Sequence, residues 1–298
     1  MKVILPAVLA ALMLGGCATG TMSEKITSDY KAVPVGQQQL EYRVYLPPQY
    51  ESEPGRHFPL LVYFHGGGGN HRSWGEEGGM GERVLPHMRD ESFGPFIVLA
   101  PSVGRYDVIT GQAETELFQH VIPQVKASYR TNEVTVAFGH SMGGLSALML
   151  GLRHPHTFSA VAAASPFAYD VSPYDSGERV EHFKQQFGGG FFLGRWQKGV
   201  AGKFQSREEF DAYSPFQQIR ALDSKPCFSL FLTTGTKDPM GLYAQNELLH
   251  RALASAGIAH EYLVQKGVAH STIGEPRLYQ WLNEQADNYS VSRSAGGN

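Results

Sequence analysis

Cysteine is nearly absent from the sequence, which contains only Cys17 and Cys227 among its 298 residues. A single cysteine beyond position 17 excludes an intramolecular disulfide in the body of the protein. Stability must therefore come from a packed core. Cys227 begins the apolar run 227–232, so we expect it to be a small buried hydrophobic residue rather than a reactive thiol.

The sequence also lacks a large excess of charge of one sign. The 25 Lys and Arg residues nearly balance the 28 Asp and Glu residues, for a net charge of −3. The chain therefore has no basic field that would attract nucleic acid or an anionic membrane surface. Since 42% of the residues are hydrophobic, a substantial core can form and disorder of the whole chain is excluded. We expect a small or uncharged ligand.

Long apolar runs are missing except at the start of the chain. Lys2 precedes an apolar stretch over residues 3–14, which is shorter than the ~20 residues of a spanning helix and is typical of a secretory signal. Its end, Leu14-Gly15-Gly16-Cys17, resembles the lipobox of bacterial lipoproteins, whose cysteine is acylated. This resemblance implies a lipid anchor at Cys17 in the cell envelope. The alternative is an ordinary secretory signal cleaved near Ala18.

The residue that follows the cysteine bears on the destination of such a lipoprotein. Ala18 resembles the pattern of lipoproteins forwarded to the outer membrane, so we expect a protein that faces the periplasm or the exterior. The sequence then divides into a signal peptide (1–16), a small polar tether (17–35), one folded domain (36–290) and a disordered tail (291–298).

The folded domain repeats one theme, in which a short apolar run is followed by a turn and then by a segment with helical spacing. Such alternation predicts a mostly parallel sheet with helices on both faces. After a first strand at 40–46, the predicted strands are 58–64, 96–100, 134–138, 158–164, 228–233 and 260–264. The predicted helices are 81–88, 114–129, 142–153, 242–256 and 276–285.

Residues 166–226 interrupt this theme because they are rich in aromatic residues and glycine and are far longer than an ordinary connection. We interpret the segment as a cap-like insertion that directly follows the strand predicted at 158–164. Eight aromatic rings lie in its first half, and we expect some of them to form an acyl or aromatic pocket, although they could simply pack the insertion onto the sheet. The rings chosen as pocket candidates are Phe191, Phe192 and Trp196.

The motif Gly139-His140-Ser141-Met142-Gly143-Gly144 lies between a predicted strand and a predicted helix. A G-x-S-x-G sequence in this context is typical of a sharp elbow that lifts a serine hydroxyl above the sheet. The start of the following helix directs backbone N–H groups at developing negative charge. Ser141 is therefore the candidate nucleophile, the alternative being a chance match in a chain with 34 glycines.

A serine hydroxyl needs a base and an orienting carboxylate, which in this arrangement follow in the order serine, acid, histidine. Asp238 stands in the turn after the strand at 228–233 and is the candidate acid, although it could instead cap the next helix. His270 follows the last predicted strand in a similar loop, and it is the candidate base.

The stretch His65-Gly66-Gly67-Gly68-Gly69 follows a buried strand directly. It resembles the HGGG loop, in which a backbone N–H of Gly66 or Gly67 would join that of Met142 in an oxyanion hole. We expect His65 to hold the loop. The sequence contains no Walker lysine, dinucleotide fingerprint or HExxH motif, so we expect neither a nucleotide nor a metal.

Taken with Arg43-Val44-Tyr45-Leu46-Pro47 and the Ser-Met-Gly-Gly form of the elbow, these motifs resemble the esterase family that contains esterase D (S-formylglutathione hydrolase), feruloyl esterases and enterochelin esterases. The resemblance spans about residues 40–281. It implies an α/β-hydrolase fold and hydrolysis of carboxylic esters through an acyl-enzyme, with Ser141, Asp238 and His270 in the family's triad positions and no cofactor. Secreted relatives commonly act on acyl groups of plant polysaccharides or on siderophore esters.

The expected substrate is a small-molecule or polysaccharide-linked ester, with no nucleic-acid partner. Two alternatives stay open. The same triad would serve an acyltransferase that favours an alcohol over water, and the fold would also serve an inactive envelope lipoprotein that only binds a partner.

Overall fold

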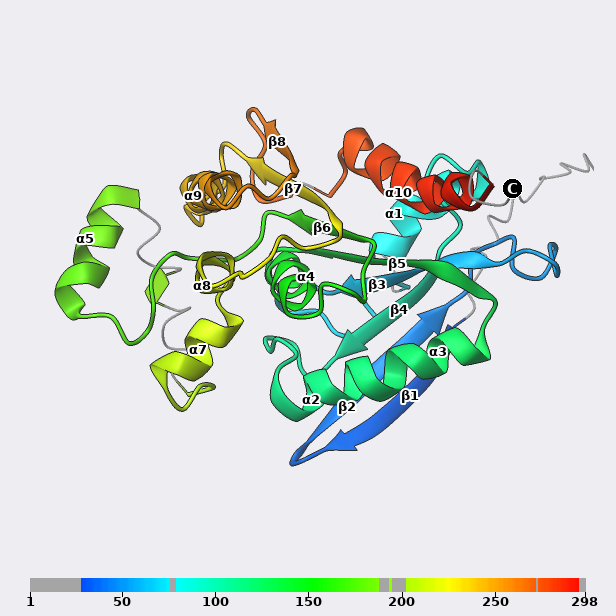
Figure 1. Cartoon of the computed structure of the whole chain (residues 1–298), viewed down its shortest axis with the longest axis horizontal. Helices are drawn as coiled ribbons and strands as arrows, with labels where there is room; N and C mark the ends of the chain where they lie inside the picture. Colours follow the sequence, from blue (N-terminus) through cyan, green and yellow to red (C-terminus); the bar gives the residue numbers. More distant parts are fainter. Residues whose placement is uncertain (1–27, 76–78, 188–192, 195–201, 272, 295–298) are drawn as a thin grey trace, which may run out of the picture.

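The computed structural model describes residues 28–75, 79–187, 193–194, 202–271 and 273–294. One sheet in the order β1-β2-β4-β3-β5-β6-β7-β8 forms its centre (Figure 1). The strand β2 pairs antiparallel with β1 on one side and with β4 on the other. The remaining neighbours in this order, from β4 and β3 to β7 and β8, pair in parallel. The strands are β1 (Ser28–Val35), β2 (Gln38–Tyr45), β3 (Phe58–Phe64), β4 (Ile97–Ser102), β5 (Thr131–His140), β6 (Ala160–Ala164), β7 (Ser229–Gly235) and β8 (Glu261–Gln265).

Helices cover both faces of this sheet, as the uninterrupted apolar runs predict. One apolar cluster lies between the sheet and α1 and α10, and a second lies between the sheet and the helices from α2 to α4 together with α9. The helices outside the insertion are α1 (Met80–Arg89), α2 (Gly111–Glu116), the π-helical turn η1 (Leu117–Val121), α3 (Ile122–Ser128), α4 (Met142–Arg153), α9 (Leu242–Ser255) and α10 (Pro276–Ser294).

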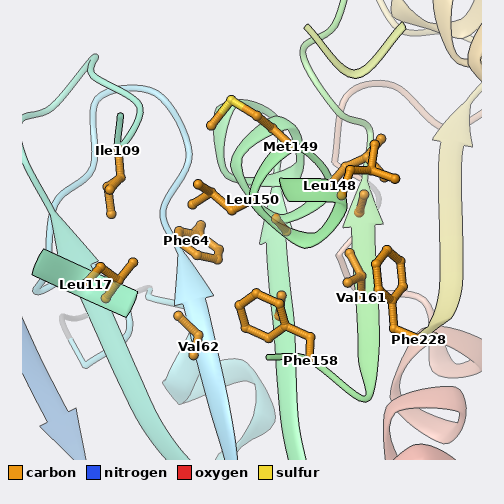
Figure 2. Packing of buried hydrophobic residues seen from close by; sticks show 14 of the residues in the cluster. Val62, Phe64, Ile109, Leu117, Leu148, Met149, Leu150, Phe158, Val161 and Phe228 are labelled. Carbon is orange, nitrogen blue, oxygen red and sulfur yellow. The ribbon is translucent and has the colours of Figure 1, made fainter. Parts of the chain in front are cut away.

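The helix α4 lies directly over the central strands. Figure 2 shows Leu148, Met149 and Leu150 of α4 above Val62 and Phe64 of β3 and Val161 of β6. All six side chains are buried. Each Å² of apolar surface that is buried contributes about 25 cal/mol to stability, so this layer is a main source of the stability of the fold. The same packing fixes the start of α4 at the edge of the sheet.

The insertion contains α5 (Gly177–Phe187), α7 (Arg207–Tyr213) and α8 (Pro215–Arg220). It follows β6, as expected, and α8 packs against α4 and α9. A small apolar cluster of its own includes Tyr169, Val180 and Phe183, and this cluster reaches Leu242 at the start of α9. The insertion is therefore anchored to the sheet domain at several points.

The structure corrects three expectations at the margins. Residues 28–35 form the edge strand β1, so the tether expected over 17–35 ends earlier. The helix α10 extends to Ser294, into the tail expected at 291–298, and residues 295–298 lie outside the described residues. Cys227 is exposed rather than buried, because β7 begins only at Ser229.

The carboxyl ends of the parallel strands meet at one edge of the sheet, where open α/β sheets bind ligands. The glycine loop follows β3, Ser141 follows β5, and the insertion follows β6. Asp238 follows β7 and His270 follows β8. No helix in the described part of the chain combines the length and apolarity needed to cross a membrane.

Candidate active site

Ser141 occupies a strained turn between β5 and α4, with φ of 58° and ψ of −120°. A side chain in this region of backbone space costs roughly 1–3 kcal/mol and persists only where the surroundings impose it. Those surroundings are backbone: a Cβ on Gly139 would overlap the carbonyl of Gly143, and a Cβ on Gly143 would overlap that of Phe64. Both glycines are therefore required for the turn.

The glycine loop after β3 lies against this turn. The N–H of Gly68 donates to the Arg105 carbonyl at 2.7 Å, and the N–H of Gly69 donates to the Gly66 carbonyl at 3.0 Å. Gly67 lines the same cavity as Ser141 and Met142, the first residue of α4. The amide of Met142 directly follows Ser141 at the start of α4, where a helix start favours negative charge, and the glycine loop borders the same space.

His65 holds the glycine loop, as expected. It is buried, its Nδ1 lies 2.9 Å from the Gly66 carbonyl, and its Nε2 lies 3.0 Å from the Ser102 hydroxyl at the end of β4. Burial lowers the pKa of His65 below its ordinary value, so the ring is neutral at neutral pH. It ties two neighbouring strands together at the site.

His270 and Asp238 form a hydrogen-bonded pair, with His270 Nδ1 at 2.6 Å from Asp238 Oδ2. The Asp238 side chain is fully buried, and its other oxygen accepts the Met240 N–H at 2.9 Å. Because a carboxylate can only accept, Nδ1 of the neutral imidazole carries the proton and Nε2 is left as a base. Asp238 does not cap α9, whose preceding residue is Gly241.

Gly235 allows this pair to form. It ends β7, and a Cβ there would overlap the carbonyls of Val268 and Ala269 in the loop that carries His270. His270 Nε2 is buried and has no hydrogen-bond partner among the described residues. Ser141 and His270 both line one cavity of about 490 Å³, so a basic nitrogen and a serine hydroxyl share the space that a ligand would enter.

A comparison with known protein families shows to which family the chain belongs. The family model described as "Putative esterase" matches residues 35–274, which is most of the chain and includes the glycine loop, the elbow, Asp238 and His270. The chain belongs to this esterase family. The protein is therefore an esterase, an enzyme that hydrolyses carboxylic esters. A search of curated proteins finds no match.

Solved structures show the same α/β-hydrolase fold. The structure of a ferulic acid esterase is similar to this chain, with a TM-score of 0.65 and 19% identity; the match covers 88% of this chain and 97% of the ferulic acid esterase. An S-formylglutathione hydrolase from Agrobacterium tumefaciens has a TM-score of 0.56 and 16% identity, over 90% and 94%. An esterase from the archaeon Pyrobaculum calidifontis has a TM-score of 0.57 and 18% identity, over 89% and 86%.

The sequence reasoning did not single out His140, the residue before the nucleophile of the esterase. Its Nε2 donates to the carbonyl oxygen of His270, and the two rings are 4.7 Å apart. Burial, followed by the neighbouring His270, lowers the pKa of His140 to about 4, so the ring is neutral at neutral pH. His140 therefore steadies the backbone that carries His270. The second letter of G-H-S-M-G was the available signal.

The three rings chosen as pocket candidates, Phe191, Phe192 and Trp196, lie outside the described residues. Among the described residues, two of the other rings counted in the insertion, Phe167 and Tyr169, line the cavity of the esterase. The sequence did not point to three further rings of the insertion that line it, Phe204, Phe210 and Tyr213. They follow the dense aromatic stretch, and only their position on and before α7 brings them to the site.

A buried carboxylate anchors this wall of the cavity. Glu114 of α2 accepts hydrogen bonds from Arg153 and His154 at the end of α4, at 2.7 Å each, and from the Tyr213 hydroxyl at 2.7 Å. Burial raises the pKa of Glu114, but these three hydrogen bonds outweigh it and lower the pKa to about 2. The carboxylate stays ionised and holds Tyr213 against the esterase core.

Proposed function

We propose that the protein hydrolyses carboxylic esters through an acyl-enzyme on Ser141, with His270 as general base and Asp238 as the acid that orients it. The observation that carries this proposal is the 2.6 Å hydrogen bond between Asp238 and His270, because it leaves Nε2 unprotonated in the cavity that Ser141 lines. This is the division of roles in a serine, histidine and aspartate triad.

In the first half-reaction, Ser141 Oγ attacks the ester carbonyl carbon while His270 Nε2 takes the hydroxyl proton. The carbonyl oxygen becomes an oxyanion, stabilised by the N–H groups of Met142 and of Gly66 or Gly67. When the tetrahedral intermediate collapses, the bond to the alcohol oxygen breaks and His270 gives that oxygen its proton. The acyl group stays on Ser141.

In the second half-reaction, His270 removes a proton from water, and the resulting hydroxide attacks the acyl carbon. A second tetrahedral intermediate collapses, Ser141 Oγ leaves with the proton from His270, and the carboxylic acid departs. Asp238 keeps its charge throughout and stabilises the imidazolium form of His270.

The apolar and aromatic lining of the cavity supports acyl or aromatic esters as substrates. Its volume of about 490 Å³ suits a small-molecule ester or the ester group of a larger carrier such as a polysaccharide. Three of the similar solved structures are described as ferulic acid esterases, one of them in complex with ferulic acid.

We further propose that the protein acts in the cell envelope on a lipid anchor at Cys17, facing the periplasm or the exterior at the outer membrane. The support is the sequence Leu14-Gly15-Gly16-Cys17-Ala18 after an apolar signal. Cys17→Ser is expected to move the protein from the membrane fraction to the soluble secreted fraction. Unchanged membrane association of the variant would contradict the anchor.

A fluorophosphonate probe tests the catalytic proposal directly, because it labels only an activated serine. We expect stoichiometric labelling of the wild-type protein at Ser141 and none of a folded Ser141→Ala variant. Labelling of both proteins would place the nucleophile elsewhere, and labelling of neither would favour an inactive binding protein. Product analysis with and without an alcohol acceptor distinguishes a hydrolase, which yields the free acid in both, from an acyltransferase.

A further inference from the structure

Three side chains of α4, Met142, Leu145 and Met149, line the cavity. Residues three and four positions apart share one face of a helix, so the three form a row that begins beside Ser141. Seven residues at about 1.5 Å each extend this row about 10 Å along the helix. Met149 is only 1% exposed, so the cavity reaches from the nucleophile into the protein interior.

The strand order shows which half of an ester would lie along this row. His270 follows β8, on one side of β5, whereas Tyr106 and Val108, which also line the cavity, follow β4 on the other side. The leaving alcohol must lie beside His270, since that residue protonates it. The wall built from Val108 and α4 therefore faces the acyl half of the ester.

Two tyrosine hydroxyls on the wall are already engaged by the protein. The Tyr213 hydroxyl donates to Glu114 and accepts from the N–H of Gly111, at 2.7 and 2.9 Å. The Tyr169 hydroxyl donates to the Met240 carbonyl at 3.1 Å. The rings of these two tyrosines line the cavity, while their hydroxyl groups are hydrogen-bonded to protein partners.

Lys203, the cation on the described part of the wall, is engaged in the same way. Its ammonium group donates to the Tyr106 carbonyl at 2.9 Å and pairs with Asp107. Its positive charge is thus already neutralised by Asp107, so a carboxylate on the ligand would gain less from Lys203 than from an unpaired cation. The wall thus favours a ligand without polar substituents.

We infer that the cavity binds the acyl group of the ester as an unsubstituted, flexible aliphatic chain of medium length, with Met149 at its far end. The inference rests on the proposed function, because it places the acyl carbon on Ser141. It narrows that function to esters of medium-chain fatty acids, with Leu145 and Met149 as residues that determine specificity.

Two substrate series separate the acyl half from the alcohol half. We expect kcat/KM for p-nitrophenyl esters to rise from acetate to octanoate by about fourfold per methylene, the equivalent of ~0.8 kcal/mol of burial, and to fall at dodecanoate. Acetate esters of increasingly long alcohols are expected to differ little from one another. A steep alcohol series with a flat acyl series would overturn the inference, as would faster hydrolysis of methyl ferulate than of methyl octanoate.

Variants at the far end of the row test its length. Met149→Phe shortens the space and is expected to move the optimum from octanoate to butyrate, lowering kcat/KM for octanoate at least tenfold while acetate changes less than threefold. Met149→Ala is expected to move the optimum toward decanoate. Met88→Phe is the matched control. Met88 is a buried methionine of α1 that belongs to a different apolar cluster, so the variant is expected to leave the profile unchanged.

A variant at Leu145 keeps the test possible if the Met149→Phe variant does not fold. If Met149→Phe does not fold, Leu145→Phe, one turn nearer the nucleophile, is expected to cut the profile still shorter. An unchanged chain-length profile in a folded variant at either position would overturn the inference. Fluorophosphonate labelling is measured on each variant, so that loss of labelling reports a failed nucleophile, whereas intact labelling with an unchanged profile reports a failed chain-length determinant.

Discussion

The two halves of the cavity are held in place by different forces. On the sheet side, the elbow and the His270 loop are fixed by backbone packing so close that Gly139, Gly143 and Gly235 leave no space for a Cβ. On the insertion side, charged side chains add hydrogen bonds and ion pairs to the apolar packing: Glu114 accepts from the Tyr213 hydroxyl, and Asp175 pairs with Arg207.

This contrast follows from what each half must do. Proton transfer and oxyanion binding require atoms placed within a fraction of an ångström, which rigid backbone packing provides. Selection among acyl groups requires only a wall of suitable shape, and ion pairs and hydrogen bonds at the ends of short helices are sufficient for that. Changes on the sheet side should therefore affect kcat, and changes on the insertion side should affect stability and selectivity.

The largest effect is expected from His270→Ala. Loss of the base should lower kcat by roughly 10⁶, because triad members act as a unit. Steady-state kinetics with a p-nitrophenyl ester, together with circular dichroism to establish folding, measure the effect. A folded variant that retains a tenth of the activity would show that the sheet side does not carry the chemistry.

Asp238→Asn is expected to cost less, about 10⁴ in kcat. The amide can donate a hydrogen bond to Nδ1, which would place the proton of the imidazole on Nε2, where it cannot act as a base. KM should change little, since Asp238 is buried behind His270. If activity is unaffected, His270 acts without Asp238.

The stability of Gly143→Ala, on the sheet side of the cavity, can be compared with that of a variant on the insertion side. A Cβ there would overlap the carbonyls of Phe64 and His65, so we expect a loss of about 3 kcal/mol or more in the free energy of unfolding. Gly177→Ala in the insertion is the matched control, because a Cβ there meets nothing within 4 Å, and it should change stability by less than about 0.5 kcal/mol. Urea titration measures both, and equal losses would contradict the contrast.

His140→Leu tests whether His140 supports catalysis by holding His270 in position. Without the donor to the His270 carbonyl, the loop should shift and kcat should fall by about 10² at nearly constant KM. His140→Gln, which keeps an N–H donor, should recover part of the loss. An equal loss in both variants, accompanied by reduced stability, would indicate a purely structural role.

The smallest effect on turnover is expected from Glu114→Gln, which should lower the free energy of unfolding by about 1–3 kcal/mol. The native pKa of about 2 lies below the ordinary value of 4.5, so this stabilisation is present above pH 4.5 and is lost as the pH falls toward 2. The variant should therefore lose less stability than the wild type over that range. The exposed Glu178→Gln serves as control, and parallel wild-type and Glu114→Gln curves would contradict the assignment.

Most of the sheet side was predictable because its signals are local. The apolar runs predicted the parallel strands and their helices, and the glycines around Ser141 predicted the elbow, since short-range sterics fix both. Asp238 and His270 were predicted from their positions after strands, and the structure brings them within hydrogen-bond distance. Their catalytic roles and the lipid anchor at Cys17 stay predictions.

The sequence by itself determined the fold and the family, because periodicity, turn glycines and residue order act over short stretches of chain. Tertiary structure alone decided the cavity. The Tyr213 hydroxyl meets Glu114 across 99 residues, and His140 meets the His270 carbonyl across 130. It also decided that residues 28–35 pair as an edge strand and that Cys227 is exposed. Such contacts depend on which surfaces the packed elements present to one another, and no local pattern encodes that.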